Sequence, residues 1–207
     1  MRTLVTLALT AMLLVPACDP ERAARSSTVG WTVRLDEPEA TGDSARVSGD
    51  GVTLEVRPGP NATLWHADRR ATGTYRLAAD VTHLDSGLHP HGAGLAFGGT
   101  AVDGDQQAYA YFLVRGDGHF LIKIRNGEDL KEIVLWTEHA AVSKEDTKGV
   151  TANHLAVEVG AEQTRFFVND TEVHTTPTAD LPTDGQFGFR LVHDLHVRFG
   201  EPTLSTL

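Results

Sequence analysis

From Val29 onward, the apolar residues of this chain recur at every second position, in short runs rich in β-branched and aromatic side chains. In the segment TYRLAADVT (74–82), apolar residues occupy positions 75, 77, 79 and 81. Because successive side chains of a strand point to opposite faces, this alternation gives the strand one buried face. Gly, Asp, Asn and Pro separate the runs, which is typical of turns. The pattern predicts an all-β fold.

The strongest hairpin signal is the segment AYAYFLVRGDGHFLIKIRNG (108–127). Glycine and aspartate tolerate the positive φ of tight primed turns, so a two-residue turn is expected at Gly116–Asp117. In that register, the predicted core face carries Tyr109, Tyr111, Leu113, Phe120, Ile122 and Ile124. Lys123 and Arg125 then lie on the opposite face, although a slip of one residue would exchange the two faces. Asn169–Asp170 predicts a second two-residue hairpin turn.

Further strands are predicted by the alternating segments 51–57, 155–160, 164–175, 185–192 and 195–204. Only the segment 138–154 lacks clear alternation, and we expect a long connection there with one helical turn. About a dozen strands, with turns every 8 to 12 residues or so, indicate two packed antiparallel sheets. The predicted architecture is a jelly-roll β-sandwich.

Several segments follow one another in an order that resembles a known family. They are TGTYRLAADV, GAGLAFGG, the 108–127 hairpin, NHLAVEVG, FFVNDTEV and GQFGFRL, over roughly residues 60–200. This succession resembles the concanavalin A-like jelly roll, and within it a group of exported bacterial domains described as 3-keto-disaccharide hydrolase-like or laminin-G-like. The shared motifs are structural, so the resemblance implies a fold more directly than a chemistry.

The chain begins MRTLVTLALTAMLLVPACDPE, in which an apolar run of about a dozen residues follows one arginine. This run is too short to cross roughly 30 Å of hydrocarbon as a helix, so residues 1–17 predict a signal peptide. Cys18, the one cysteine of the chain, stands directly after small residues. This resembles the lipobox of bacterial lipoproteins and implies lipidation of Cys18; a leftover cysteine beside an ordinary cleavage site is the alternative. Residues 18–28 then form a tether and residues 29–207 the concanavalin A-like β-sandwich.

These features predict a bacterial cell-envelope protein, anchored to the membrane by lipid and facing the periplasm or the exterior. A chain with one cysteine forms no internal disulfide, so its core must hold the fold. The chain has 18 basic and 28 acidic residues, a net charge of −10. Nucleic acid is therefore not an expected partner, because phosphate binding needs a basic face.

Motifs for hydrolytic chemistry are weak. Retaining glycosidases need two carboxyl groups about 5 to 5.5 Å apart, and in the nearest acidic segment, 128–132, Leu130 occupies the middle same-face position. The sequence contains no GxSxG nucleophile motif. The resemblance implies cleavage of a modified disaccharide by acid–base residues, for which Asp80, Glu132, His119 and the segment 193–196 are candidates.

Carbohydrate binding without catalysis needs aromatic faces for sugar rings and polar groups for hydroxyls. The candidate ligand-binding residues are Trp65, Lys123, Arg125, Trp136 and Arg190. The alternative is core packing for the tryptophans and a solvated face for the cationic side chains.

Two segments suggest metal binding. His89 and His91 flank Pro90, which places them at the entrance of a strand, and imidazole is a frequent Zn²⁺ ligand. Asp103 and Asp105 flank Gly104 in a loop between predicted strands and resemble half of a Ca²⁺ site. The alternatives are a polar loop and a plain turn, because a zinc site needs a third ligand and Asp-Gly pairs form turns.

The function expected from the sequence is a lipid-anchored envelope protein with a non-catalytic β-sandwich that binds a carbohydrate or an envelope partner. Two alternatives remain open. One is a glycoside hydrolase or lyase acting on a modified (3-keto) disaccharide, and the other is a structural interaction protein of the envelope.

Overall fold

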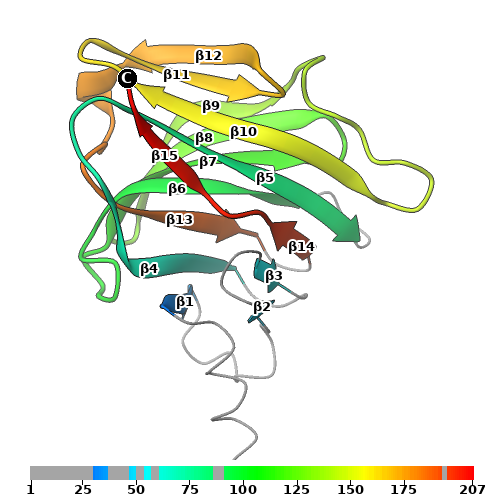
Figure 1. The fold of residues 1–207 in the computed structure, drawn as a ribbon, viewed down its shortest axis with the longest axis horizontal. Helices are drawn as coiled ribbons and strands as arrows, with labels where there is room; N and C mark the ends of the chain where they lie inside the picture. The colour runs from blue at the N-terminus through cyan, green and yellow to red at the C-terminus, as the bar shows by residue number, and fades with distance from the viewer. Residues whose placement is uncertain (1–29, 37–46, 50–53, 57–60, 86–90, 193–194) are drawn as a thin grey trace, which may run out of the picture.

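The computed structural model describes residues 30–36, 47–49, 54–56, 61–85, 91–192 and 195–207 (Figure 1). The predicted signal peptide 1–17, lipidated Cys18, the tether to residue 28 and His89 lie outside these residues. The described residues form two antiparallel sheets, and the order of elements confirms the predicted all-β jelly-roll sandwich. No helix within the described ranges is long and apolar enough to cross a membrane.

The first sheet has seven strands. In spatial order its strands are β1 (Trp31–Leu35), β4 (Ala62–Ala71), β13 (Gly185–Leu191), β6 (Gly92–Thr100), β7 (Ala108–Arg115), β8 (His119–Asn126) and β9 (Asp129–Glu138). Strands β6 to β9 form a meander of consecutive antiparallel pairs, with β9 at the edge.

The second sheet has eight strands and packs against the first (Figure 1). In spatial order its strands are β12 (Thr171–Pro177), β11 (Gln163–Val168), β10 (Thr151–Val159), β5 (Tyr75–Asp85), β14 (His196–Phe199), β3 (Leu54–Val56) and β2 (Val47–Gly49), with β15 (Thr203–Thr206) pairing β5 beside β14. A single turn of 3₁₀ helix, η1 (Thr178–Asp180), follows β12.

Aromatic side chains join the two sheets at the centre of the sandwich. Phe112 of β7 meets Phe166 of β11 edge to face, with ring centroids 5.3 Å apart. Phe189 of β13 stacks on Phe199 of β14 at 4.2 Å. All four side chains are fully buried, and aromatic pairs of this kind contribute about 0.5–1.5 kcal/mol each beyond the area they bury.

The β7–β8 hairpin differs from its predicted register by one residue. Val114 pairs with Phe120 rather than with His119, so three residues form the loop. The residue with positive φ is Gly118, at +90°, and its N–H donates to the carbonyl of Arg115. A three-residue loop with glycine in the left-handed region replaces the two-residue turn. The slip exchanges the faces of β7 only, so Phe112 faces the core, whereas Tyr109, Tyr111 and Leu113 face outward with Lys123 and Arg125. Phe120 and Ile122 of β8 face the core as predicted.

Of three other local predictions, two are confirmed and one is wrong. Asn169 and Asp170 both have positive φ, at +48° and +64°, and form the two-residue turn between β11 and β12. In β5, the side chains at positions 75, 77, 79 and 81 are buried. The expected helical turn within 138–154 is wrong: β9 runs to Glu138, β10 begins at Thr151, and turns connect them.

Candidate functional site

The outer face of the seven-stranded sheet, which points away from the sandwich core, carries its own buried apolar cluster. Its buried members are Trp65, Ala96, Val102, Tyr109, Tyr111, Leu113 and Leu121, with Trp136 and Val192 packed against them. An antiparallel sheet that faces water usually alternates apolar and polar side chains, with the polar ones outside. A buried apolar cluster on this face therefore distinguishes it from a simply solvated surface.

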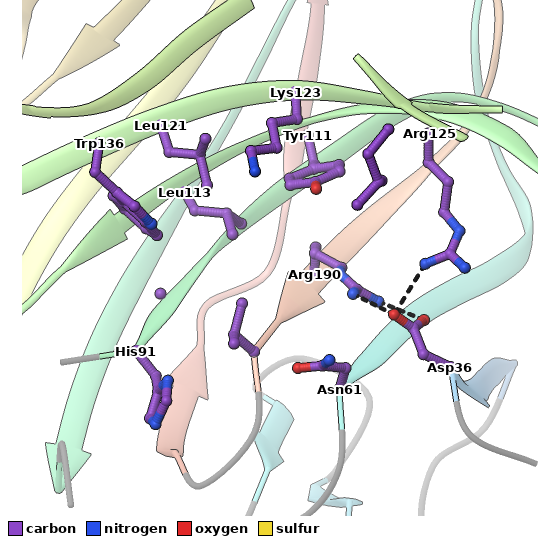
Figure 2. Close-up of a pocket in the computed structure, with 13 residues that line it drawn as sticks. Asp36, Asn61, His91, Tyr111, Leu113, Leu121, Lys123, Arg125, Trp136 and Arg190 are labelled. Carbon is purple, nitrogen blue, oxygen red and sulfur yellow. Dashed lines mark hydrogen bonds and ion pairs between the residues drawn. The ribbon is translucent and has the colours of Figure 1, made fainter. Parts of the chain in front are cut away.

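A pocket of about 290 Å³ opens beside this cluster (Figure 2). Its volume is near the lower end of the range for small-molecule sites, roughly 300–1,000 Å³. The described residues that line it are Asp36, Asn61, His91, Gly92, Tyr111, Leu113, Leu121, Lys123, Arg125, Leu130, Trp136, Arg190 and Val192. They come from β6, β7, β8, β9 and β13 and from residues beside β1 and β4, so the sheet itself forms the floor and the walls.

Asp36, directly after β1, lies between two arginines at one end of the pocket (Figure 2). Arg190 donates from Nη1 to Asp36 Oδ1 at 2.8 Å and from Nη2 to Oδ2 at 2.5 Å, a bidentate pair. Arg125 donates from Nη1 to Asp36 Oδ2 at 2.9 Å and from Nε to the carbonyl of Gly127. One carboxylate therefore holds two guanidinium groups in fixed positions.

The electrostatics of this cluster keep Asp36 and Arg190 charged. Burial alone would raise the pKa of the Asp36 carboxyl, but hydrogen bonds and charges from Arg190 and Arg125 hold that pKa below its ordinary value. Burial opposes the charge on Arg190, yet its hydrogen bond to Asp36 keeps the Arg190 pKa above its usual value. Burial raises the pKa of Tyr111 to about 12, so its hydroxyl stays protonated.

Trp136 of β9 forms the opposite end of the pocket (Figure 2). The guanidinium of Arg115 lies 4.4 Å from the centre of its ring, a cation–π contact. Asp117 fixes Arg115 in turn, accepting from Nε at 2.9 Å and from Nη2 at 2.7 Å. A Cβ at Gly92 would lie only 2.5 Å from the Trp136 ring, so only glycine leaves room for the ring in this position.

Lys123 lies between the two ends, on the same face of β8 as Arg125. Its Nζ is 2.8 Å from Oε1 of Glu132, the residue opposite it on β9. The Glu132 side chain is 48% exposed, so this ion pair lies at the rim rather than inside the pocket.

The structure brings four of the five predicted ligand-binding residues around this pocket, namely Lys123, Arg125, Trp136 and Arg190. Trp65 does not line it: the side chain is 1% exposed and its ring meets Tyr109 edge to face at 5.2 Å. The core-packing alternative therefore describes Trp65. Sequence reasoning missed Asp36, which follows a short strand without any motif, and missed Tyr111, which the slipped register had assigned to the core.

The residues proposed for metal binding are not brought together. His91 precedes β6, whereas Asp103 and Asp105 lie in the loop after its far end, about 30 Å away along a nine-residue strand. Asp105 lies 4.0 Å from Nη2 of Arg34, which also donates to the carbonyl of Gly104. Within the described part of the chain, no three His, Cys, Asp or Glu side chains are grouped as metal ligands. His89 lies outside that part, so the zinc interpretation stays a prediction.

The acid–base candidates are also dispersed. Asp80 lies on the eight-stranded sheet, where its Oδ1 is 2.8 Å from Nδ1 of His154. Glu132 pairs with Lys123 at the rim, and His119 contacts Asp117 at the β7–β8 loop. His193 and Asp194 lie outside the described residues. Among the described residues that line the pocket, Asp36 is the only carboxylate, and two arginines hold it ionised.

No model of a known protein family matches the chain, and no curated protein sequence matches it. Solved structures do share its fold. The carbohydrate-binding module CBM66 from Bacillus subtilis superposes with a TM-score of 0.59 at 16% identity, over 86% of this chain and 96% of that one. A Bacillus subtilis protein of unknown function with a galectin-like fold gives 0.57 at 10% identity, over 88% and 91%.

A third similar structure is the exoplasmic, lumenal domain of VIP36 in a form bound to Ca²⁺ and Man3GlcNAc. It superposes with a TM-score of 0.59 at 11% identity, over 86% of this chain and 84% of that one. At these identities, the likeness shows the fold alone. The chain therefore has a galectin-like, concanavalin A-like β-sandwich fold.

Proposed function

We propose that this protein is a non-catalytic carbohydrate-binding module, and that it holds a sugar in the pocket on the outer face of the seven-stranded sheet. The observation that carries the proposal is the pocket itself, in which an aromatic ring and fixed hydrogen-bonding groups face one hollow. The Trp136 ring offers an apolar surface for a sugar ring, while Lys123 and Arg125 offer hydrogen-bond donors for its substituents. Two structures with the same fold, CBM66 and the VIP36 form with Man3GlcNAc, support this proposal.

The composition of the pocket favours binding over hydrolysis. A retaining glycosidase uses two carboxyl groups about 5 to 5.5 Å apart, one of them protonated. Among the described lining residues, Asp36 is the single carboxylate, and Arg190 and Arg125 lower its pKa, so it is a poor proton donor. In this proposal, the resemblance to the 3-keto-disaccharide hydrolase-like group is a resemblance of fold. The bound sugar is not cleaved and is released unchanged.

The proposal includes the cellular location of the protein. We propose that the mature chain begins at Cys18, carries lipid there, and presents the sandwich to the periplasm or to the exterior of a bacterial cell. The small-residue site before the single cysteine supports this. Metabolic labelling with an alkynyl fatty acid tests it: label should enter the wild-type chain and not a Cys18→Ser variant, and equal labelling of both would disprove lipidation at this residue.

A glycan array probed with the purified protein tests the binding function. We expect saturable binding to a subset of glycans, and chromatography after long incubation should return each ligand unchanged. Trp136→Ala should weaken the binding at least tenfold, which corresponds to about 1.4 kcal/mol, because buried aromatic anchors dominate binding energies. Leu135→Ala is the matched control, since Leu135 is the neighbouring residue of β9, is 61% exposed and does not line the pocket.

Each other result has a defined meaning. Product release from any glycan would establish the hydrolase alternative instead. Silence across the whole array would leave the chain as an envelope interaction protein and overturn the binding proposal. Equal losses in Trp136→Ala and Leu135→Ala would place the binding surface elsewhere.

A further inference from the structure

The charges that line the pocket are opposite in sign to the charge of the chain. Among the described residues, Lys123, Arg125 and Arg190 line the pocket with one carboxylate, that of Asp36. The whole chain has 28 acidic and 18 basic residues. A hollow with walls of low dielectric focuses the field of its charges, so a local excess of cations in an acidic protein favours anionic ligands.

The two arginines play different parts in this excess. Arg190 is nearly buried, with a side chain 7% exposed, and its two Nη groups both donate to Asp36. Arg190 and Asp36 therefore form a bidentate ion pair with no net charge, and this pair has a structural role in the sheet. Arg125 then carries the surplus positive charge, and its bonds to Asp36 and to the carbonyl of Gly127 hold the guanidinium in place.

Lys123 adds a second cation whose partner is easily replaced. Its ion pair with Glu132 is formed at the rim, where the carboxylate is half-exposed, and such pairs contribute little to stability. Lys123 and Arg125 are two residues apart on one face of β8, so their Cα atoms are separated by about 6.5 Å. Both side chains line the same pocket.

The hydrogen-bonding groups of the pocket also favour an anionic ligand. Arg125 has five N–H donors, and its contacts within the described residues use two of them. Lys123 has three donors, of which Glu132 engages one. Both oxygens of Asp36 already accept hydrogen bonds from the arginines. This part of the pocket is thus rich in donors and poor in acceptors, which suits a ligand group with several acceptor oxygens and no hydrogen to donate.

From these observations we infer that the ligand is an acidic sugar, whose carboxylate or sulfate lies between Lys123 and Arg125 while its ring lies toward Trp136. This inference rests on the proposed function and names its ligand class. In it, the ligand's anion takes the place of Glu132 as the partner of Lys123. A carboxylate and a sulfate share the required chemistry, which is a planar or tetrahedral group of acceptor oxygens with negative charge.

The test compares acidic and neutral probes on the purified protein by calorimetric titration. Oligogalacturonate and oligoalginate serve as carboxylated probes, a carrageenan oligosaccharide as the sulfated probe, and mannotriose and maltotriose as neutral probes. We expect binding to at least one acidic probe, at least tenfold weaker binding to its methyl-esterified or desulfated form, and a loss of affinity as the salt concentration rises. The probe class that binds distinguishes a uronate from a sulfated ligand.

Three variants sharpen the test. Lys123→Gln should weaken binding of the acidic probe about tenfold or more, because a hydrogen bond between two charged groups is lost. Glu132→Gln should strengthen it by about two- to fivefold, because the competing carboxylate at the rim is removed. Lys131→Gln changes the net charge by the same amount as Lys123→Gln, but Lys131 is exposed on β9 and does not line the pocket, so it should have little effect.

The outcomes separate the two proposals. Binding of neutral probes alone, with loss in Trp136→Ala, would overturn the acidic ligand and leave the carbohydrate-binding function standing. Acidic binding that Lys131→Gln weakens as much as Lys123→Gln would reduce the effect to net charge and overturn the site. No binding to any acidic or neutral glycan would overturn both the ligand class and the proposed function.

Discussion

The outer faces of the two sheets each place one carboxylate between two arginines, yet the two clusters have opposite surroundings. On the eight-stranded sheet, Glu158 pairs with Arg76 at 2.6 Å and also with Arg165. Two more carboxylates are close, since Asp170 is 3.9 Å from Arg76 and Glu172 is 3.7 Å from Arg165. On the seven-stranded sheet, Asp36 is the single carboxylate among the described residues of the pocket that holds Arg125 and Arg190.

The difference shows that an ion-pair cluster acquires a binding role through what surrounds it. Arg165 is 49% exposed and its charge is balanced by neighbouring carboxylates, so water and protein already satisfy it. Arg190 is 7% exposed and Arg125 is 15% exposed, in a hollow with fewer carboxylates than cations. One carboxylate between two arginines thus forms a solvated surface on one sheet and a candidate anion site on the other.

The largest expected effect comes from removing Asp36, the central carboxylate of the cluster at the pocket. Asp36→Ala leaves Arg190 buried without its counter-ion and should lower the free energy of unfolding by about 3–5 kcal/mol. Glu158→Ala leaves two partly exposed arginines that still have other carboxylates nearby, and should cost about 0–1 kcal/mol. Urea denaturation of both variants at neutral pH measures the contrast. Equal losses would mean that the two clusters are energetically alike.

A buried histidine on the inner face of the eight-stranded sheet extends the comparison. Arg190 is buried with a partner, whereas His83 of β5 is fully buried and neither ring nitrogen has a hydrogen-bond partner among the described residues. Burial lowers the pKa of His83 from 6.5 to about 4. The unfolded chain therefore binds a proton at His83 at a higher pH than the folded chain does, and stability is complete above pH 6.5 and falls as the pH approaches 4.

The expected loss from His83 over this window is about 3 kcal/mol. Urea denaturation at a series of pH values should show it, and His83→Leu should flatten that part of the curve. Asp36, whose folded-state pKa is lowered, should add a further loss only below about pH 4, where the unfolded chain begins to take up a proton on this carboxylate while the folded chain still keeps it ionised. A curve for His83→Leu that matches the wild type between pH 6.5 and 4 would contradict the role given to His83.

Gly92→Ala tests whether glycan binding depends on the close packing of the Trp136 ring against Gly92. The added Cβ would overlap the Trp136 ring, and the ring is the part that can move, so we expect a cost of about 1 kcal/mol and a ring displaced into the pocket. Glycan affinity should fall with it. Gly104→Ala is the control, because a Cβ there has its nearest neighbour at 3.7 Å and Gly104 does not line the pocket. Unchanged affinity in Gly92→Ala would show that the position of Trp136 does not matter for binding.

Local patterns were sufficient to predict the fold. Alternation identified β5 and its buried face, and Asn169–Asp170 identified a turn whose two residues both require positive φ. In the β7–β8 loop the same reasoning found the turn but not its length. The residues Gly116, Asp117 and Gly118 are compatible with a two-residue loop (116–117) and with a three-residue loop (116–118). Of the three, only Gly118 has a φ that L side chains rarely adopt. A one-residue difference in loop length decided which face of the sheet Tyr111 occupies.

The site was less predictable because its parts are distant in sequence. Asp36 and Arg190 are 154 residues apart and meet only when β1 and β13 join the same sheet. The sequence also treats Trp65 and Trp136 as equivalent aromatic residues. Their difference arises in three dimensions: Trp65 lies on β4 as a buried member of the outer apolar cluster, whereas Trp136 lies on β9, beside which the described residues place no further strand.

The smallest expected effect compares two cation–π contacts. Arg115 lies 4.4 Å from the ring centre of Trp136, and Arg165 lies 5.4 Å from that of Phe167 on the eight-stranded sheet. Such contacts contribute about 0.5–1 kcal/mol at exposed sites, so Arg115→Gln and Arg165→Gln should each change stability by no more than that. Only Arg115→Gln should also weaken glycan binding, by about two- to fivefold, because Arg115 holds the ring that faces the pocket. Calorimetric titration of both variants measures this, and an equal change in affinity would show that Arg115 acts through its charge rather than by orienting Trp136.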